Sequence, residues 1–276
     1  MPDVGRDPAH PTFLTTPDRP QKPRGRGLTH VLDKGYPLEH VRWVLAASAG
    51  FIDLWKFGWG TAYVDAELGD KLAVLAANDI RACPGGTLLE IAWLQNRTSE
   101  FFDWAVAAGF GCVEVSNGAT GLPAPDKRRL IREAAERGFD VLAEVGSKDP
   151  RVEIAPEHWA EEIEADLAAG ARWVVTEGRE SGTVGLFDAD GAVRSDIVDA
   201  IERHVECSQL IFEAPRRNQQ AWLIRHFGPT VNLGNIGLDE ITGVETLRLG
   251  LRVDTIGIGV DGAAGLEDGG SHARRR

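Results

Sequence analysis

Four glutamates that lie inside, or at the end of, short apolar runs are the residues of this 276-residue chain with the clearest chemical potential. A buried carboxylate without a partner is strongly destabilising, so several that converge on one place require cations. Arginines could supply that charge as internal salt bridges. A metal ion is the alternative, and all-oxygen ligands suit Mg²⁺ or Mn²⁺ better than zinc. The predicted metal ligands are Glu114, Glu144, Glu177 and Glu213.

Basic residues follow the same apolar runs, in a chain whose 42 acidic and 30 basic residues give a net charge of -12. Cations gathered within an acidic protein point to an anionic substrate, and Arg forks suit carboxylate and phosphate. Nearby glycine-rich turns could donate backbone N–H groups to phosphate oxygens. We therefore predict a phosphorylated, carboxylated small molecule as substrate. The cations are Lys34, Lys56, Lys148, Arg179, Arg216 and Arg217, and Asp33, Ser116 and Asn232 are the other predicted substrate-binding residues.

Two aromatic and basic residues in one stretch require separate consideration. Lys56 lies in the apolar run Leu54–Phe57. It is either a buried residue that forms an ion pair or contacts substrate, or an amine whose pKa burial lowers for Schiff-base or acid–base chemistry. Trp59 lies in a loop between two glycines and could line the pocket.

The elements that must position these residues alternate between residues 27 and 260. Eight short apolar runs read as strands, and segments of helical period lie between them. Eight such units predict an α/β protein with a (β/α)₈ TIM barrel in a single domain, whose catalytic groups lie where strands end. An open doubly wound sheet is the alternative, but residues 34–37 are not a dinucleotide loop. The strands are expected at 28–33, 51–57, 79–83, 112–116, 140–145, 173–177, 209–213 and 230–233, and the helices at 38–49, 99–108, 125–137, 156–169, 195–205, 218–227 and 239–249.

The two ends of the chain differ in composition from the barrel. Residues 1–26 are rich in proline and arginine and predict a flexible arm. Residues 27–260 form the predicted catalytic domain, and residues 261–276 predict a flexible tail.

Charge and composition exclude several classes of function. The excess of acidic residues repels nucleic-acid phosphates and anionic membranes, and no run reaches about 18 apolar residues. The N-terminus has no apolar signal sequence, and three scattered cysteines form neither a disulfide framework nor a zinc motif. We therefore expect a cytoplasmic protein with no nucleic-acid or membrane partner. Barrels of this kind usually associate through helix faces, so we also expect a homo-oligomer.

Several stretches, in one order from about residue 27 to 257, resemble the phosphosulfolactate synthase family. The two most specific are KFGWGT at residues 56–61 and EGRESG at residues 177–182. The others include LTHVLDKG at 28–35, PGGTL at 84–88, VEVS at 113–116, EVG at 144–146, GLFD at 185–188, IFEAP at 211–215, VNL at 231–233 and ETLR at 245–248.

This resemblance implies a Mg²⁺-dependent enzyme that adds sulfite to phosphoenolpyruvate, giving (2R)-O-phospho-3-sulfolactate, the first step of a route to coenzyme M. It also implies a (β/α)₈ barrel and places a lysine after the glutamate of the fifth strand. Lys148 matches that lysine and is the candidate general acid at C2. Lys56 and Arg179, with Arg216 or Arg217, would hold the phosphate, carboxylate and sulfite.

Three positions depart from the family pattern. Ser147 stands where a first lysine is common, the loop at 183–185 is one residue shorter, and Arg216 and Arg217 replace a Gln–Lys pair. A different nucleophile or enol acceptor is therefore an open alternative. So are an aldolase-like reaction through a lysine Schiff base and a non-catalytic, stress-associated scaffold.

Overall fold

Eight parallel strands form the inner wall of the protein, seen here in a computed structural model that describes residues 13–147 and 154–259. Nearly every strand residue is buried, as expected when helices cover the outer face of a parallel sheet and side chains fill its interior. The strands are β1 (Thr29–Asp33), β2 (Leu54–Phe57), β3 (Arg81–Cys83), β4 (Cys112–Val115), β5 (Asp140–Val145), β6 (Trp173–Thr176), β7 (Leu210–Glu213) and β8 (Leu233–Ile236).

The strand order is β3-β2-β1-β8-β7-β6-β5-β4, so the first and last strands of the chain pair side by side. Within the described residues, β3 and β4 are neighbours without a shared ladder of backbone hydrogen bonds. The barrel is thus nearly closed, with one seam. The predicted single-domain (β/α)₈ barrel is confirmed.

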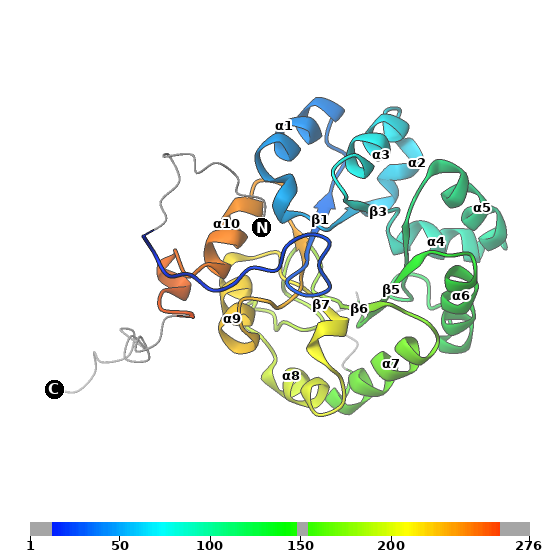
Figure 1. Ribbon diagram of the computed structural model, residues 1–276. Helices are drawn as coiled ribbons and strands as arrows, with labels where there is room; N and C mark the ends of the chain where they lie inside the picture. Colours follow the sequence, from blue (N-terminus) through cyan, green and yellow to red (C-terminus); the bar gives the residue numbers. More distant parts are fainter. Residues whose placement is uncertain (1–12, 148–153, 260–276) are drawn as a thin grey trace.

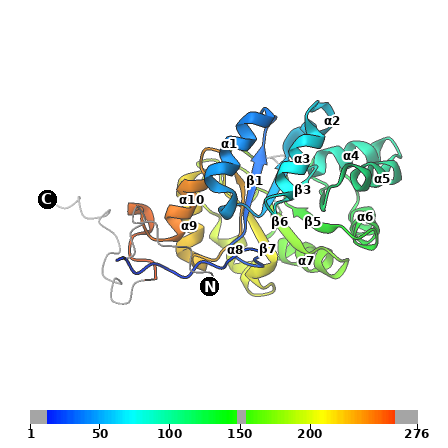
Figure 2. The same ribbon diagram turned by 45° about the horizontal axis from the view of Figure 1, so that its top comes forward.

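Helices surround the strands in a ring, as Figures 1 and 2 show. The longer helices pack an apolar stripe inward: α6, for example, buries Leu130, Ile131 and Ala134, and its charged residues Arg129, Arg132 and Glu136 are exposed. In the described part of the chain, no helix is long and apolar enough to cross a bilayer. The helices are α1 (Leu38–Ser48), α2 (Thr61–Val64), α3 (Leu68–Ala76), α4 (Gly86–Leu94), α5 (Thr98–Ala108), α6 (Ala124–Glu136), α7 (Pro156–Ala168), α8 (Ser195–Glu202), α9 (Arg217–Phe227) and α10 (Ile241–Arg248), with short 3-10 turns η1 (Ala49–Phe51), η2 (Gly58–Gly60), η3 (Cys207–Gln209) and η4 (Val253–Thr255).

The predicted and observed elements differ most at the last strand. The sequence predicted residues 230–233, whereas β8 is Leu233–Ile236. Glycine and asparagine disfavour strands, which hid this segment. Gly234 suits this crowded position, because a Cβ atom would lie only 3.0 Å from Ile211 and 3.1 Å from the Nδ1 atom of His30. Packing inside the barrel therefore overrides local preference. The helices α2, α3 and α4 were also not predicted.

A buried glutamate closes the seam between β3 and β4. Glu90, on α4, is fully buried and accepts hydrogen bonds from the Ser116 hydroxyl at 2.6 Å and the Ala119 N–H at 3.0 Å. Its Oε2 atom also accepts from the N–H and the hydroxyl of Thr120, both at 2.8 Å. One carboxylate therefore joins α4 to the loop after β4, where the backbone ladder is missing.

We expect Glu90→Ala to lower the free energy of unfolding by about 2–4 kcal/mol, because it leaves several buried donors unsatisfied. Urea unfolding of the variant measures this loss. Glu136→Ala, an exposed glutamate on α6, is the control and should stay within about 0.5 kcal/mol of the wild type. Equal stability of the two variants would contradict a role for Glu90 at the seam.

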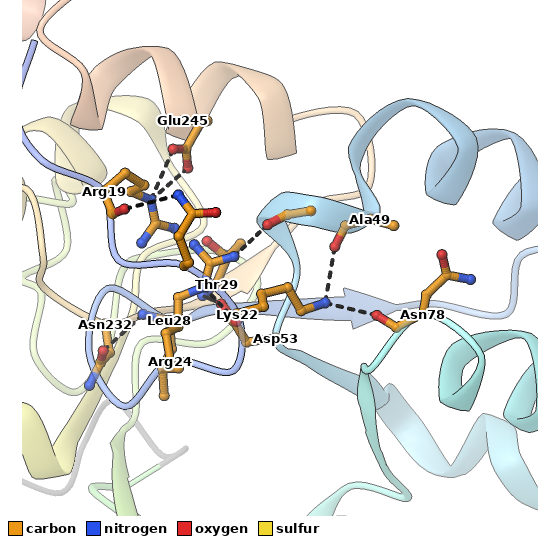
Figure 3. Close-up of polar contacts among 12 residues, drawn as sticks. Arg19, Lys22, Arg24, Leu28, Thr29, Ala49, Asp53, Asn78, Asn232 and Glu245 are labelled. Carbon is orange, nitrogen blue, oxygen red and sulfur yellow. Dashed lines mark hydrogen bonds and ion pairs between the residues drawn. The ribbon is translucent and has the colours of Figure 1, made fainter. Parts of the chain in front are cut away.

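The described part of the N-terminal arm, from residue 13 onward, docks across the base of the barrel (Figures 1 and 3). Lys22 donates to the carbonyl oxygens of Ala49 at 3.1 Å and Asn78 at 2.9 Å, near the ends of α1 and α3. A cation at the C-terminal end of a helix is stabilising, since carbonyl groups there lack intrahelical partners.

Two arginines of the same arm form buried ion pairs. The Nε atom of Arg19 lies 2.9 Å from Glu245 on α10, and that of Arg24 lies 2.9 Å from Asp53 just before β2 (Figure 3). Arg24 also donates to the carbonyl oxygen of Gly50. Residues 13–26, predicted as part of a flexible arm from their composition, thus contact early elements of the barrel near β2 and the late helix α10. The predicted tail at 261–276 lies outside the described residues.

Candidate active site

A buried lysine lies among three glutamates at the C-terminal end of the barrel. The Nζ atom of Lys56, on β2, is 3.0 Å from Glu114 on β4 and 3.1 Å from Glu213 on β7. Glu144, on β5, lies 3.9 Å from the same atom. Each of these residues occupies the last or next-to-last position of its strand, and alternation along the strand directs its side chain into the barrel.

The electrostatics of this cluster fix the charge of Lys56. Burial alone would lower the pKa of its amine, but Glu114, Glu213 and Glu144 together raise that pKa well above the ordinary lysine value. Lys56 is therefore an ammonium ion at any physiological pH. A Schiff base requires a neutral amine, so the environment opposes the aldolase-like hypothesis at this lysine.

The loop after β6 wraps around two of the carboxylates. Glu213 accepts hydrogen bonds from the N–H groups of Gly178 at 3.0 Å and Arg179 at 3.1 Å. Glu177 accepts from the same Arg179 N–H at 2.7 Å. Gly86, at the start of α4, donates to Glu114 at 2.8 Å. Backbone N–H groups thus fix the orientation of the carboxylates before any ligand binds.

A pocket of about 240 Å³ opens above this cluster. Five carboxylates and two cations are among its described lining residues, which gives the pocket a marked excess of negative charge. The lining residues are Leu32, Lys56, Gly58, Trp59, Gly85, Gly86, Thr87, Glu114, Glu144, Glu177, Arg179, Glu180, Glu213 and Asn235.

Three lining residues other than glycine have a left-handed backbone. The φ angles are 54° at Trp59, 53° at Arg179 and 53° at Asn235. This conformation costs about 1–2 kcal/mol per residue and persists where the surroundings enforce it, most often at functional sites. Its concentration around one pocket supports the assignment of this pocket as the active site.

The sequence profile of (2R)-phospho-3-sulfolactate synthase (ComA) matches residues 17–254 of the chain. The chain belongs to the phosphosulfolactate synthase family. Phosphosulfolactate synthase of Methanothermobacter thermautotrophicus is 42% identical over 250 residues, which are 89% of this chain and 96% of that protein. Phosphosulfolactate synthase of Bacillus subtilis is 40% identical over 245 residues, 88% of this chain and 97% of that protein. The chain is therefore an enzyme of this family.

Among solved structures, 3-hexulose-6-phosphate synthase from Salmonella typhimurium has a similar fold. The TM-score is 0.55 at 12% sequence identity, over 82% of this chain and 100% of that chain. This likeness supports the barrel and carries no information on the reaction of the phosphosulfolactate synthase family.

The pocket unites most of the charged residues that the sequence singled out for this family member. Glu114, Glu144, Glu177, Glu213, Lys56 and Arg179 all line it. Trp59, suggested by its glycine-flanked loop, does so as well. Lys148, the candidate general acid, lies outside the described residues.

Other predicted substrate-binding residues take structural positions in the described chain. Asp33 is buried and accepts from the N–H groups of Gly35 at 2.8 Å and Tyr36 at 2.9 Å. It also accepts from the indole N–H of Trp55 at 3.1 Å. The hydroxyl of Ser116 is used by Glu90, as described above. Lys34 is exposed at the rim.

The remaining three predicted positions lie away from the lining. Asn232 precedes β8 at the base of the barrel, where its side chain bonds the backbone of Leu28 and Leu210. Arg216 is half-buried at the start of α9, and Arg217 is exposed, 3.8 Å from Asp254. Asn232 was predicted at the pocket because the last strand was predicted three residues too early in the sequence. In the structure the strand is β8, and Asn235, which the sequence analysis did not select, lines the pocket instead.

The donor chemistry of the pocket fits a hard divalent cation. Among the described residues, no three acidic, His or Cys side chains are arranged as a ready metal cage. The ammonium group of Lys56 lies between the carboxylates of Glu114, Glu144 and Glu213. It keeps these three carboxylates too far apart to form such a cage by themselves. Mg²⁺ usually needs no such cage, because it binds one or two carboxylates together with waters and oxygens of the substrate. The excess of carboxylates provides the charge for such an ion.

A glycine in the loop after β6 packs tightly against the site. At Gly185 the φ angle is 65°, and a Cβ atom would lie 2.0 Å from the carbonyl oxygen of Glu177. We expect Gly185→Ala to lower the free energy of unfolding by about 3 kcal/mol, because the added methyl group would push the loop away from Glu177. The same displacement should reduce turnover. Gly138→Ala is the control, because Gly138 also has a positive φ but a Cβ atom there would meet nothing within 4 Å. Its loss of stability therefore measures only the cost of the backbone conformation. Similar losses of stability in the two variants, followed by urea unfolding, would contradict this expectation.

Proposed function

We propose that this enzyme adds sulfite to phosphoenolpyruvate in the presence of Mg²⁺ and forms (2R)-O-phospho-3-sulfolactate. The proposal is supported by one combined observation: strand-end carboxylates and Lys56 converge in a pocket of a chain 42% identical to a phosphosulfolactate synthase. The proposal extends to a place in coenzyme M biosynthesis, to a cytoplasmic location and to a homo-oligomer formed through helix faces. Light scattering of the purified protein tests the oligomer.

Sulfite needs no activation, since its sulfur lone pair is already nucleophilic. In the proposed reaction a bond forms between this sulfur and C3, and the π electrons of C2=C3 move onto the substrate carboxylate. A proton delivered to C2 then restores the carboxylate and sets the stereochemistry. The protein must therefore stabilise the charge that develops on the carboxylate and must place one acid beside C2.

The described residues divide these tasks. We assign the binding of the phosphate or the carboxylate, in a planar fork, to the guanidinium of Arg179, which lines the pocket. The positive charge of Lys56 holds Glu114 and Glu213 in place and makes the floor of the pocket less negative. We assign the delivery of the proton at C2 to Lys148.

We assign Mg²⁺ to Glu144 and Glu177, which belong to adjacent strand ends and both line the pocket. Glu114 and Glu213 lie 3.0 Å and 3.1 Å from the Lys56 ammonium, which already balances part of their charge. When bound, Mg²⁺ supplies a positive charge that stabilises the developing carboxylate charge.

Phosphorus NMR of the protein mixed with phosphoenolpyruvate, sulfite and Mg²⁺ tests the proposed function. We expect a new phosphate-ester signal that requires sulfite and disappears with EDTA. An unchanged phosphoenolpyruvate signal, from folded protein supplied with Mg²⁺, would contradict the proposal. Nucleophiles other than sulfite would then be tested, because Arg216 and Arg217 differ from the family pattern. Borohydride trapping with a keto substrate separately tests a Schiff base at Lys148. Absence of any effect of Mg²⁺ or phosphoenolpyruvate on melting would favour the scaffold alternative.

The general acid has its own test. We expect Lys148→Ala to lose turnover by about 100-fold or more and to retain binding of phosphoenolpyruvate, because proton transfer contributes to the reaction and not to binding. Calorimetry measures the binding, and phosphorus NMR measures the turnover. Near-normal turnover in this variant would remove Lys148 from the mechanism.

A further inference from the structure

Trp59 has a position that folding alone does not explain. Its side chain is 58% exposed, so it adds little to the core. Its backbone is left-handed, with a φ of 54°, between Gly58 and Gly60. A large aromatic residue that is both strained and exposed lowers stability, and such outliers point to a function.

Trp59 borders two hollows of the surface. It lines the active-site pocket and also a neighbouring groove of about 560 Å³. Tyr63, Leu88, Ile91 and Trp104 are among the residues that give this groove an apolar wall. The indole therefore has an apolar place to rest beside the pocket and a polar, charged space on its other side.

A cation accompanies the indole. The ammonium group of Lys34 lies 5.5 Å from the centre of the Trp59 ring, within the range of a cation–π contact. Lys34 follows β1 and is exposed at the rim, and no hydrogen bond fixes it among the described residues. This contact favours a position of the positive charge beside the ring, at the rim of the pocket.

We propose that Trp59 is a positioning residue that closes the pocket over the bound anion. In the open state the indole rests along the groove. When a phosphorylated carboxylate binds, the indole covers it, excludes water and brings the ammonium of Lys34 toward the anion. The inference rests on the proposed function in that phosphoenolpyruvate is the anion.

Gly60 fits this movement. It has a φ of 71°, and a Cβ atom there would meet nothing within 4 Å, so the constraint is conformational and not steric. The turn at Gly58–Gly60 leads directly into α2 at Thr61, which gives the indole a short, separate backbone segment to move on.

Quenching of tryptophan fluorescence by acrylamide tests the closure. Of the eight tryptophans, Trp43 and Trp59 have the most exposed side chains. In a Trp43→Phe protein, Trp59 is therefore the most accessible emitter. We expect phosphoenolpyruvate with Mg²⁺ to lower the quenching constant of this protein about twofold, since a covered ring loses most contact with solvent. In a Trp59→Phe protein, where Trp43 remains, the constant should not change.

Kinetics of matched variants tests the link to Lys34. We expect Trp59→Ala to raise the KM for phosphoenolpyruvate about tenfold, with a smaller rise for Trp59→Phe, which keeps an aromatic face. Lys34→Met should raise KM in the wild-type background and have little further effect in the Trp59→Ala background, because the two side chains act together. Full additivity of the two substitutions would overturn the proposed coupling.

The outcomes separate this inference from the proposed function. Calorimetric binding of phosphoenolpyruvate with unchanged quenching of Trp59 would overturn the closure and leave the function intact. Absence of both binding and turnover would overturn the function, and inorganic phosphate is then the second probe. Protection of Trp59 by phosphate would still support closure over an anion, and unchanged quenching with phosphate as well would overturn it.

Discussion

Lys56→Met should abolish turnover and lower the free energy of unfolding by about 3–5 kcal/mol at pH 8. The substitution keeps most of the side-chain volume and removes the charge that lies 3.0 Å from Glu114 and 3.1 Å from Glu213. Removing the ammonium leaves buried carboxylates without a cation. The free-energy cost of these uncompensated charges is larger than the stability that the intact ion pairs contribute. We expect the fall in kcat/KM to be at least about 1,000-fold, since the orientation of several carboxylates depends on one ammonium group.

The pH dependence of the wild-type protein has a defined sign at Lys56. Glu114, Glu213 and Glu144 raise the pKa of its amine well above the ordinary lysine value, despite its burial. The folded protein therefore keeps this proton at a pH where the unfolded chain releases it, so the stability it contributes is lost as pH rises above the ordinary lysine pKa. Urea unfolding at pH 8 and pH 11 should show a smaller loss of stability with rising pH in Lys56→Met than in the wild type.

Lys71→Met is the matched control for Lys56→Met. Lys71 is another buried lysine, which contacts Asp65 and the carbonyl oxygen of Tyr36 away from the pocket. Its loss should lower stability but leave the turnover of the folded protein close to that of the wild type. A Lys56→Met protein with near-normal turnover would remove Lys56 from the catalytic machinery.

Glu177→Gln should raise the Mg²⁺ concentration needed for half-maximal turnover about 100-fold. The amide keeps the size of the side chain and loses the charge, and the proposed Mg²⁺ would be held by charge as much as by geometry. Glu144→Gln should behave similarly, because both side chains line the pocket from adjacent strand ends. Calorimetric titration of Mg²⁺ in the presence of phosphoenolpyruvate provides a readout independent of turnover.

The control for these two variants is Glu164→Gln, an exposed glutamate on α7. It should titrate with Mg²⁺ as the wild type does. An unchanged Mg²⁺ titration in both Glu177→Gln and Glu144→Gln would show that the ion binds elsewhere or that the reaction does not use it. Chelation by EDTA distinguishes these two results, since only a reaction that uses a metal stops.

The arrangement of the glutamates was predictable because a barrel brings the C-terminal ends of all its parallel strands to one side. Once the apolar runs were assigned as strands, Glu114, Glu144 and Glu213 had to converge. The state of Lys56 was not predictable, because burial and nearby carboxylates move a lysine pKa in opposite directions. Only their distances decide the sign.

The roles of several other residues could not be predicted from sequence patterns. Asp33 has the type and position of a substrate ligand, yet its oxygens bind backbone N–H groups and Trp55. Asn232 and Asn235 differ by three positions in one polar run. Asn235 lies on β8 and lines the pocket, whereas Asn232 precedes the strand and bonds backbone groups at the base. Composition predicted a flexible arm, but it contains no information about the partners that Arg19 and Arg24 find in the folded barrel.

The docked arm and the β1–β8 pairing have a consequence for synthesis on the ribosome. Arg19 contacts Glu245 across 226 residues, and Leu28 contacts Asn232 across 204 residues. At ordinary translation speeds, the first strand waits about 10–40 s for the partner that covers its open edge. During that interval an apolar strand edge is exposed to aggregation or to chaperones. The nascent chain therefore depends on protection for its first strand until its last strand emerges.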